Sequence, residues 1–388
     1  METKASQEKP DLSKELQGDL VDGNAAAVYK IERFFPFEHH FADTNFADMQ
    51  RVHLPLLSRN QHDEPIDLSK ILVFDLETTG LAGGAGTFPF LIGLGTIEPD
   101  GMRTVQYFLP DYGREPIAYL DLDGSFKEKT VLLSFNGKSY DYPLLNNRFI
   151  LNRIENPWQG MMHLDLLHFA RRLWKSRLTS CSLEAIEQEI FLFHRYGDIE
   201  GWLIPQAYFD FLQTGKIDDI RKIINHNQQD LISLGRLLFY LDQIERADRR
   251  DSLSDHDLQS LFRLAIKSGE MASVQSLLGE IESRRIVINT GTLIEYSLLL
   301  KRKNLWHDAA IVWEQLLAAQ NHILFALEEL AKYHEHKLRN LDQARYYTVR
   351  GLKYLEITGQ INRTEHLSEA EEQFQYRLDR LMIKIARQ

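Results

Sequence analysis

The chain has 388 residues, of which 44% are hydrophobic and 26% charged, and its formal net charge is −11. This length allows two or three domains with separate cores, and the composition is that of a folded globular protein. A negative net charge disfavours tight coating of duplex DNA, which needs an excess of Lys and Arg. The single cysteine, Cys181, excludes an internal disulfide bond and fits a reducing, cytoplasmic setting.

The N-terminal region is polar and gives no targeting signal. The first ten residues, METKASQEKP, have no apolar core behind them, so we expect no signal peptide. The chain contains no run of about 18 apolar residues, so we expect no membrane span and no membrane partner. Residues 1–65 are predicted to be a partly disordered extension. An aromatic group within residues 28–57 is expected to pack onto the domain that follows.

Residues 66–245 have the mixed pattern of an α/β domain. Short apolar runs predict buried strands, and Pro99-Asp100-Gly101 joins two of them in a hairpin. The expected strands are 71–74, 90–98, 102–109 and 131–135, and the expected helices lie near 141–153, 165–176, 182–190 and 217–245. Residues 110–130 are acidic and are expected to be irregular. This order predicts a mixed sheet covered by helices.

Residues 246–388 give a pattern of successive amphipathic helices without convincing strands. Two helix pairs resemble each other and carry Ala309 and Ala344 at matching places, 35 residues apart. This spacing is close to the period of about 34 residues in tetratricopeptide (TPR) repeats. We predict a TPR-like all-helical domain, with a plain helical bundle as the alternative.

Carboxylates stand at the ends of the expected strands. Asp75 and Glu77 lie two residues apart at the end of the first strand, so their side chains project to the same face. Two like charges placed together need a cation, and Mg²⁺ or Mn²⁺ prefers carboxylate oxygens. Asp141 follows another strand, and Asp230 shares a helix face with His226, four residues before it. These residues are the candidate metal site.

The motifs together resemble a known family. The sequences DLETTG and NGKSYD, followed by an aspartate on a late helix, are similar to the pattern of DEDD-type 3′–5′ exonucleases of the ribonuclease H-like superfamily. With GTFPFLIGLG, HLDLLHFARRLW, DIEGWLIPQAYFDF and HNQQDLISLGRLL, the chain resembles the YprB-type predicted exonuclease family over about residues 68–240. The resemblance implies a ribonuclease H-like domain at 66–245, followed by the TPR-like region at 246–388.

The resemblance implies two-metal hydrolysis of phosphodiester bonds with two Mg²⁺ or Mn²⁺ ions. Asp75, Glu77 and Asp230 hold one ion, Asp75 reaches a second, and Asp141 acts through a bound water. The expected substrate-binding residues, which hold the terminal nucleotide or its phosphates, are Thr78, Thr79, Asn136, Lys138 and Arg148.

The last motif departs from the family in its histidine. His226 has three residues between it and Asp230, which is the spacing that these exonucleases give to a tyrosine, and Asn225 occupies the usual histidine place. His226 is predicted to orient the attacking water or to act as general base, with a supporting role as the alternative.

Three further features have simpler interpretations. Asp165 is expected to cap or orient a helix start rather than to bind metal, and Asp198 and Glu200 are expected on a surface loop, with a position facing the site as the alternative. The basic segment 171–177 contains Trp174, a combination that suits phosphate contact and base stacking, but a solvated helix face is the preferred interpretation.

The sequence therefore predicts a metal-dependent nuclease, a 3′–5′ exonuclease on single-stranded DNA or RNA ends. The helical region, being nearly neutral, is expected to bind a protein partner. A structure-selective endonuclease on the same fold and a non-catalytic scaffold acting through the repeats remain alternatives.

Overall fold

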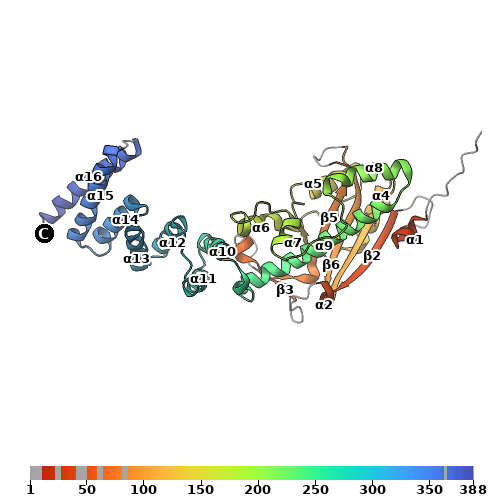
Figure 1. Cartoon of the computed structure of the whole chain (residues 1–388), viewed down its shortest axis with the longest axis horizontal. Coiled ribbons are helices and arrows are strands. Elements are labelled where there is room, and N and C mark those ends of the chain that lie inside the picture. Colours follow the sequence, from red (N-terminus) through yellow and green to blue (C-terminus); the bar gives the residue numbers. More distant parts are fainter. Residues whose placement is uncertain are drawn as a thin grey trace, which may run out of the picture. The chain divides into compact units, whose positions relative to one another are not determined.

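The computed structural model describes residues 11–21, 28–40, 50–58, 64–80, 86–361 and 365–387. The chain divides into two compact units, Met1–Asp257 and Leu258–Gln388. The first unit contains a sheet with helices and the second is built from helices (Figure 1). The boundary expected after residue 245 coincides with the end of helix α9 (Asp218–Glu245), whereas the first compact unit extends to Asp257.

A seven-stranded mixed sheet forms the centre of the first unit. Its strands, in spatial order, are β1 (Asp19–Val21), β2 (Val28–Pro36), β7 (Gly101–Phe108), β6 (Pro89–Glu98), β5 (Ile71–Thr78), β8 (Val131–Ser134) and β9 (Met162–Asp165). β8 runs parallel to β5 and to β9, and the other pairs are antiparallel. A separate ladder joins β3 (Arg51–Val52) to β4 (Ile66–Asp67). The predicted mixed sheet and hairpin are thus confirmed.

The N-terminal residues contribute to this sheet. β1 and β2 belong to the region expected as an extension, and β2 pairs along its length with β7. Part of the aromatic group packs as predicted, since the Phe37 ring meets Phe239 edge-on at 5.8 Å between centroids. Phe41 and Phe46 lie outside the described residues.

Strand β5 buries both of its faces. Ile71 to Phe74 are fully buried, because apolar side chains that point to both sides favour a strand in the middle of a covered sheet. The Phe74 ring packs 5.8 Å from Trp158 on one face. The side chains of Asp75 and Glu77 project from the opposite face, which α9 covers where it lies against β5, β6 and β7 (Figure 1).

A row of residues across the sheet fixes the position of α9. In the strand register, Asp75 pairs with Gly93 of β6, which pairs with Gln106 of β7. Asn227 of α9 sits over Gly93, where a Cβ atom would come within 2.1 Å of the Asn227 Oδ1. Asn227 Nδ2 donates to Asp75 Oδ2 at 2.8 Å, and Asn227 Oδ1 accepts from Gln106 Nε2 at 2.8 Å. Gln106 Nε2 also donates to the carbonyl of Ile224 at 2.8 Å, so one turn of α9 is held to the sheet by polar contacts.

The helices of the first unit differ from expectation in two places. Their bounds are α1 (Leu12–Leu16), α2 (Phe37–His40), α3 (Pro55–Ser58), α4 (Glu115–Ser125), α5 (Asp141–Leu151), α6 (Leu166–Trp174), α7 (Leu183–Glu189), α8 (Ile204–Thr214) and α9. The expectation of irregular structure at 110–130 was wrong, because α4 occupies much of it. Its Pro116 suits the first turn of a helix, and Ala118, Tyr119 and Leu122 are fully buried.

Two short elements were missed. Helix α8 begins beside Pro205, and four-residue β9 is too short to give a periodic signal. Ser182 caps α7, where its side chain accepts from the Ala185 amide at 3.2 Å. Asp165 caps α6, where its side chain accepts from the Leu167 amide at 3.1 Å, so the predicted capping role is confirmed.

The second unit is all-helical, as predicted. Its helices are α10 (Asp255–Ser268), α11 (Met271–Ser283), α12 (Thr290–Arg302), α13 (Trp306–Ala318), α14 (Ile323–His336), α15 (Leu341–Ile361) and α16 (Glu365–Ile385), and α10 begins within the last residues of the first unit. Helices α11, α13 and α15 start 35 residues apart, and Ala309 and Ala344 are both fully buried. The buried carboxylate of Glu335 ties α14 to α16 by accepting from Arg377 and Arg380. In the described part of the chain, no helix combines the length and the hydropathy of a membrane span.

The row across the sheet predicts the effect of adding one methyl group. We expect Gly93→Ala to lower the free energy of unfolding by about 1–3 kcal/mol, because the methyl group displaces Asn227 and breaks its buried hydrogen bonds. Urea unfolding measures this change. Gly86→Ala is the control, since a Cβ there meets no atom within 4 Å. A Gly93→Ala protein as stable as wild type would contradict the packing.

Candidate metal centre

The predicted metal site is assembled from β5 and α9. One potential ligand atom from each of Glu77, His226 and Asp230 lies within 4.8 Å of the other two. His226 and Asp230 occupy one face of α9, as their spacing predicts, and Glu77 projects from the sheet beneath them. A register shift between Glu77 and Thr78 interrupts the β5–β6 ladder at this point, and such irregularities redirect side chains at strand ends.

Asp75 is held beside this group by Asn227. The hydrogen bond from Asn227 fixes one carboxylate oxygen, and Asn227 itself is fully buried. Burial raises the pKa of Asp75 well above its ordinary value, and the negative charges of Asp230 and Asp141 raise it further. The pKa of Glu77 is raised in the same way, first by burial and then by Asp75 and the neighbouring carboxylates. Without a cation, these groups favour protonation.

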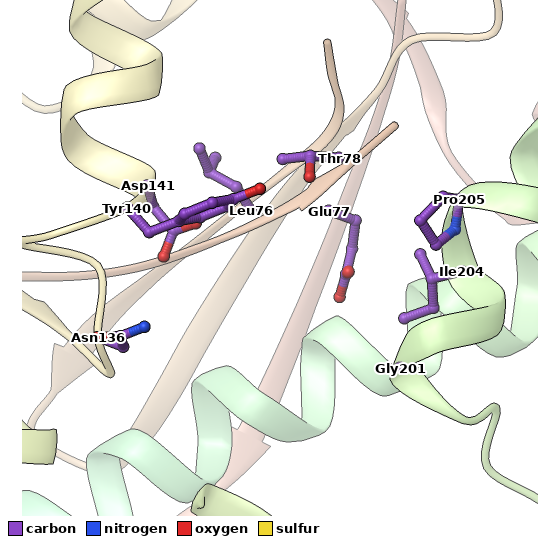
Figure 2. A pocket seen from close by; sticks show the side chains of 9 residues that line it. All are labelled: Leu76, Glu77, Thr78, Asn136, Tyr140, Asp141, Gly201, Ile204 and Pro205. Atoms are coloured by element: carbon purple, nitrogen blue, oxygen red, sulfur yellow. The ribbon is translucent and has the colours of Figure 1, made fainter. Parts of the chain in front are cut away.

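Asp141 reaches the site from the start of α5. Its side chain is 8% exposed, and burial together with the charge of Asp165 raises its pKa to about 7. Figure 2 shows Asp141, Tyr140 and Asn136 on one side of a pocket and Gly201, Ile204 and Pro205 on the other, with the Glu77 carboxylate between them. The pocket has a volume of about 260 Å³. The carboxylates of Glu77 and Asp141 therefore border one open space.

His226 is oriented by an acidic residue of the connection between α7 and α8. Its Nδ1 lies 2.8 Å from Asp198 Oδ2, and its Nε2 lies 3.7 Å from Asp230 Oδ2. A proton on Nδ1 satisfies Asp198 and leaves Nε2 as the nitrogen that faces Asp230. The alternative considered for Asp198, a position facing the site, is the one that the structure has. Glu200 is exposed and lines a different pocket.

Arg195 is a component of the site that sequence reasoning missed. Its guanidinium binds both oxygens of Glu187 at 2.7 Å and also contacts Asp230 and, at 3.2 Å, Asp198. Burial acts to lower the pKa of Arg195, but the hydrogen bonds and charges of Glu187 and Asp230 more than offset it and raise the pKa. Arg195 stands in a connection without helical or strand periodicity, so no sequence pattern marks it.

The loop after β8 is shaped by Asp165. Asp165 Oδ1 accepts from the Asn136 amide at 2.8 Å, and Asp165 Oδ2 accepts from the Lys138 amide at 3.2 Å. Asn136 has a φ of 66°, in the left-handed region that Asn tolerates. A Cβ at Gly137 would come within 2.6 Å of the Ser134 hydroxyl, so this loop requires glycine there. Asp165 thus orients the loop that carries Asn136 and the exposed Lys138.

The two threonines shape the rim of the pocket. The Thr78 hydroxyl donates to the Gly80 carbonyl at 2.8 Å, and Tyr140 donates its hydroxyl to the same carbonyl. Thr79 Oγ1 accepts from the Phe88 amide at 2.9 Å. Thr78 lines the pocket, whereas Thr79 joins the two ends of the loop between β5 and β6.

Two residues that the sequence placed at or near the site have partners elsewhere. Arg148 binds Glu115 of α4 through two hydrogen bonds, and its side chain is 18% exposed. Asn225 accepts from Arg33 of β2 at 3.3 Å, whereas His226 reaches Asp230. Geometry therefore selects His226 over Asn225 as the residue that faces the carboxylates.

The basic segment 171–177 cannot stack bases through its tryptophan. Trp174 is fully buried, with its ring 6.2 Å from that of Tyr240. Arg172 donates to the Leu57 carbonyl, and Arg177 pairs with Asp257 at 3.0 Å. The idea that Trp174 binds bases is therefore wrong, because the helix turns this ring into the core.

The donor set fits a divalent metal. Carboxylate oxygens with one imidazole nitrogen are ligands that Mn²⁺ accepts, and the carboxylates alone suit Mg²⁺. Burial first, and then the neighbouring carboxylates, raise the pKa of Asp75 and of Glu77, so the charged forms are disfavoured without a cation. Arg195 neutralises part of this charge at Asp230. A divalent cation between the remaining carboxylates would neutralise the rest.

Comparison with known proteins agrees with this geometry. Residues 72–241 match the family model of the RNase H superfamily. The chain is also 29% identical over 317 residues to the uncharacterized protein YprB of Bacillus subtilis (strain 168), and the match covers 80% of this chain and 76% of that protein. The resemblance to the YprB-type family and the ribonuclease H-like fold are confirmed. The matched segment begins one residue into β5 and ends within α9, so it spans every candidate metal ligand.

The raised pKa of Asp141 predicts how stability depends on pH without metal. Its pKa of about 7 in the fold lies above its ordinary value, so the fold favours the protonated form. The contribution to stability is complete below about pH 4 and is lost as the pH rises through 7.

In the presence of EDTA, we therefore expect the free energy of unfolding to fall between pH 5 and pH 8. Asp141→Asn should flatten this fall by on the order of 2 kcal/mol, because the amide does not titrate. Urea unfolding at each pH measures it. Identical pH dependence in both proteins would show that Asp141 does not titrate as the structure requires.

Proposed function

We propose that this protein is a metal-dependent nuclease that removes nucleotides from the 3′ ends of single-stranded DNA or RNA. The observation that carries the proposal is the convergence of Glu77, His226 and Asp230 within 4.8 Å beside Asp75 and Asp141. The RNase H superfamily domain supports a hydrolase that acts on nucleic acid at this coarse level. The exonuclease mode and the 3′–5′ polarity come from the resemblance to DEDD-type enzymes.

The metal ligands in this proposal are Asp75, Glu77, Asp141 and Asp230, serving two Mg²⁺ or Mn²⁺ ions. When bound, the two ions would stabilise the attacking and leaving oxygens of an in-line displacement at phosphorus. Asn227 holds the Asp75 carboxylate in one orientation through a partly buried hydrogen bond. Outer contacts of this kind keep ligands in place and typically matter by 10–100-fold in metal affinity or activity.

His226 is the proposed proton acceptor. With its proton on Nδ1, His226 donates a hydrogen bond to Asp198 Oδ2, and Nε2 then carries the lone pair that faces the carboxylates. In this position Nε2 can accept a proton from the attacking water. Arg195 holds Asp198 and Asp230 on either side of the imidazole and is itself anchored by Glu187.

The pocket beside Glu77 and Asp141 is the proposed place for the terminal nucleotide. Thr78, Asn136 and Tyr140 line it and offer polar groups to the sugar and phosphate. Lys138, exposed on the same loop as Asn136, is a proposed phosphate contact. Arg148 remains a proposed contact only if substrate draws it from Glu115, with which it pairs in a largely buried position.

The helical unit is proposed to bind a protein partner. Its three helix pairs repeat at about 35 residues, which favours a TPR-like array over a plain bundle. Such arrays offer extended surfaces to other proteins. Its nearly neutral charge makes nucleic acid a less favourable partner.

Hydrolysis of end-labelled strands tests the proposed activity. We expect the wild-type protein with Mg²⁺ or Mn²⁺ to shorten single-stranded DNA or RNA from the 3′ end, and Asp75→Asn to slow cleavage by more than about a hundredfold, since metal contacts supply several kcal/mol of transition-state stabilisation. Glu98→Gln is the control. This carboxylate lies at the other end of the β5–β6 hairpin, where it binds Arg103.

A circular single strand separates the two modes of cleavage. An exonuclease leaves the circle intact, whereas cleavage of the circle would favour the endonuclease alternative. Two results would refute the proposed enzyme and favour the non-catalytic scaffold. One is no cleavage of single strands, duplexes or DNA–RNA hybrids, and the other is full activity of the Asp75→Asn protein.

A further inference from the structure

An exposed tryptophan adjoins, in the sequence, residues that line the pocket. Trp202 lies between Gly201 and Ile204, two of the residues that line the pocket, and its side chain is 67% exposed. By contrast, Trp158, Trp174 and Trp313 are buried. The free energy falls when a large aromatic ring leaves water. A ligand that covers the exposed Trp202 ring would therefore gain binding energy.

The backbone around Trp202 is held firmly. Gly201–Leu203 form one turn of 3-10 helix, in which the Leu203 amide donates to the Glu200 carbonyl at 2.8 Å. Ile199 and Ile204, on either side of this turn, are buried in the main core of the first unit. Pro205 follows in the first turn of α8. The tryptophan therefore projects from a fixed segment, and binding to it needs little ordering of the protein.

The turn at Gly201–Leu203 lies across the pocket from the carboxylates, so it lies beside the path proposed for the nucleic-acid strand. Gly201, Ile204 and Pro205 form the wall of the pocket opposite Tyr140 and Asp141, with Glu77 between the two walls (Figure 2). A strand whose phosphodiester lies at Glu77 and Asp141 has one neighbouring nucleotide within reach of this wall. The ring nearest in sequence to the wall and open to solvent is that of Trp202.

The charges around the turn favour stacking over phosphate contact. None of the nine residues that line the pocket is Lys or Arg, and Asp198 and Glu200 precede the turn. The residues of this wall offer the phosphate backbone no cationic side chain, so a contact that does not depend on charge suits this side of the pocket. Stacking of a base on an aromatic ring provides such a contact and is tolerant of sequence.

We propose that Trp202 stacks on an unpaired base next to the nucleotide in the pocket, and that this contact selects single-stranded nucleic acid. In a blunt duplex, the base next to the terminal one is paired and is stacked between two neighbours, so neither of its faces is open to the ring. This inference rests on the proposed nuclease function and adds to it the contact that distinguishes a single strand from a duplex. It also replaces Trp174, the tryptophan that the basic segment suggested and that the core buries.

Equilibrium binding of fluorescein-labelled oligonucleotides tests the proposal. The probes are a thymidine 20-mer single strand and a blunt duplex of equal length, measured by anisotropy with Ca²⁺ in place of Mg²⁺. We expect Trp202→Ala to weaken binding of the single strand about tenfold and to leave binding of the duplex unchanged. Trp202→Phe should stay within about threefold of wild type, because it keeps an aromatic face.

Two controls exclude other causes. Tyr376→Ala removes an aromatic ring of α16 that is 69% exposed, and should leave single-strand binding unchanged. The urea midpoint of Trp202→Ala should equal that of wild type, since the ring is largely in water. The tenfold ratio should persist when the salt concentration is raised, because stacking releases few counterions.

The possible results distinguish a failure of the stacking proposal from a failure of the proposed nuclease activity. Three results would overturn the role of Trp202. The Trp202→Ala protein could bind the single strand within twofold of wild type, or it could lose affinity equally for the strand and the duplex. The wild-type protein could also fail to bind the single strand. If Asp75→Asn abolishes cleavage in these cases, the nuclease proposal still stands. If cleavage is absent but the binding pattern is as expected, the stacking contact stands and the catalytic proposal fails.

Discussion

The contact of Asn227 with the sheet is the interaction on which the candidate site depends. Asp75, Gly93 and Gln106 form one row across three strands, and the missing side chain at Gly93 makes room for the Asn227 amide between its two neighbours. Both polar atoms of that amide have partners: its nitrogen donates to the half-buried Asp75 and its oxygen accepts from the fully buried Gln106. A buried polar network of this kind is costly to break and therefore specifies one position of the helix. With α9 fixed there, His226 and Asp230 come down beside Glu77.

Charge is the second constraint on this region. The fold collects Asp75, Glu77, Asp141, Asp198 and Asp230 around one space, and Arg195 is the cation that pairs with two of them. Burial and mutual repulsion raise the pKa of Asp75 and Glu77, which means that the metal-free fold is destabilised by its own site at neutral pH. Such a cost is characteristic of functional sites rather than of structural ion pairs. It also accounts for part of the acidity that distinguishes residues 66–245 from the helical unit.

Much of the architecture could be predicted because long, regular patterns determine it. The run Ile71–Phe74 predicted a central strand, and the period of residues 217–245 predicted α9. Helix α4 was missed because Pro116 and the Asp-Gly pair near its end look like a loop, although Pro116 starts the helix and Tyr119 anchors it in the core. Strand β9 was missed because four residues carry no usable period.

Of the metal-site residues, only those that lie in regular strands and helices could be predicted from the sequence. Carboxylates at strand ends and on a helix face can be read from spacing, whereas Arg195 and Asp198 lie in an irregular connection whose path only the fold determines. Asn227 did leave a signal, since it is a polar residue on the helix face that carries Ile223, Ile224 and Leu231. The two tryptophans show the limit of composition: Trp174 sits among basic residues yet is buried, and Trp202 lies in an apolar motif yet is exposed.

The central claim is that residues from β5 and α9, distant in sequence, form one metal site. Mn²⁺ binding to the full chain, followed by electron paramagnetic resonance of the free ion, tests it most directly. The account predicts saturable binding by wild type and at least about tenfold weaker binding by both Asp75→Asn and Asp230→Asn. Absence of saturable binding by wild type, or wild-type affinity in Asp230→Asn, would contradict it.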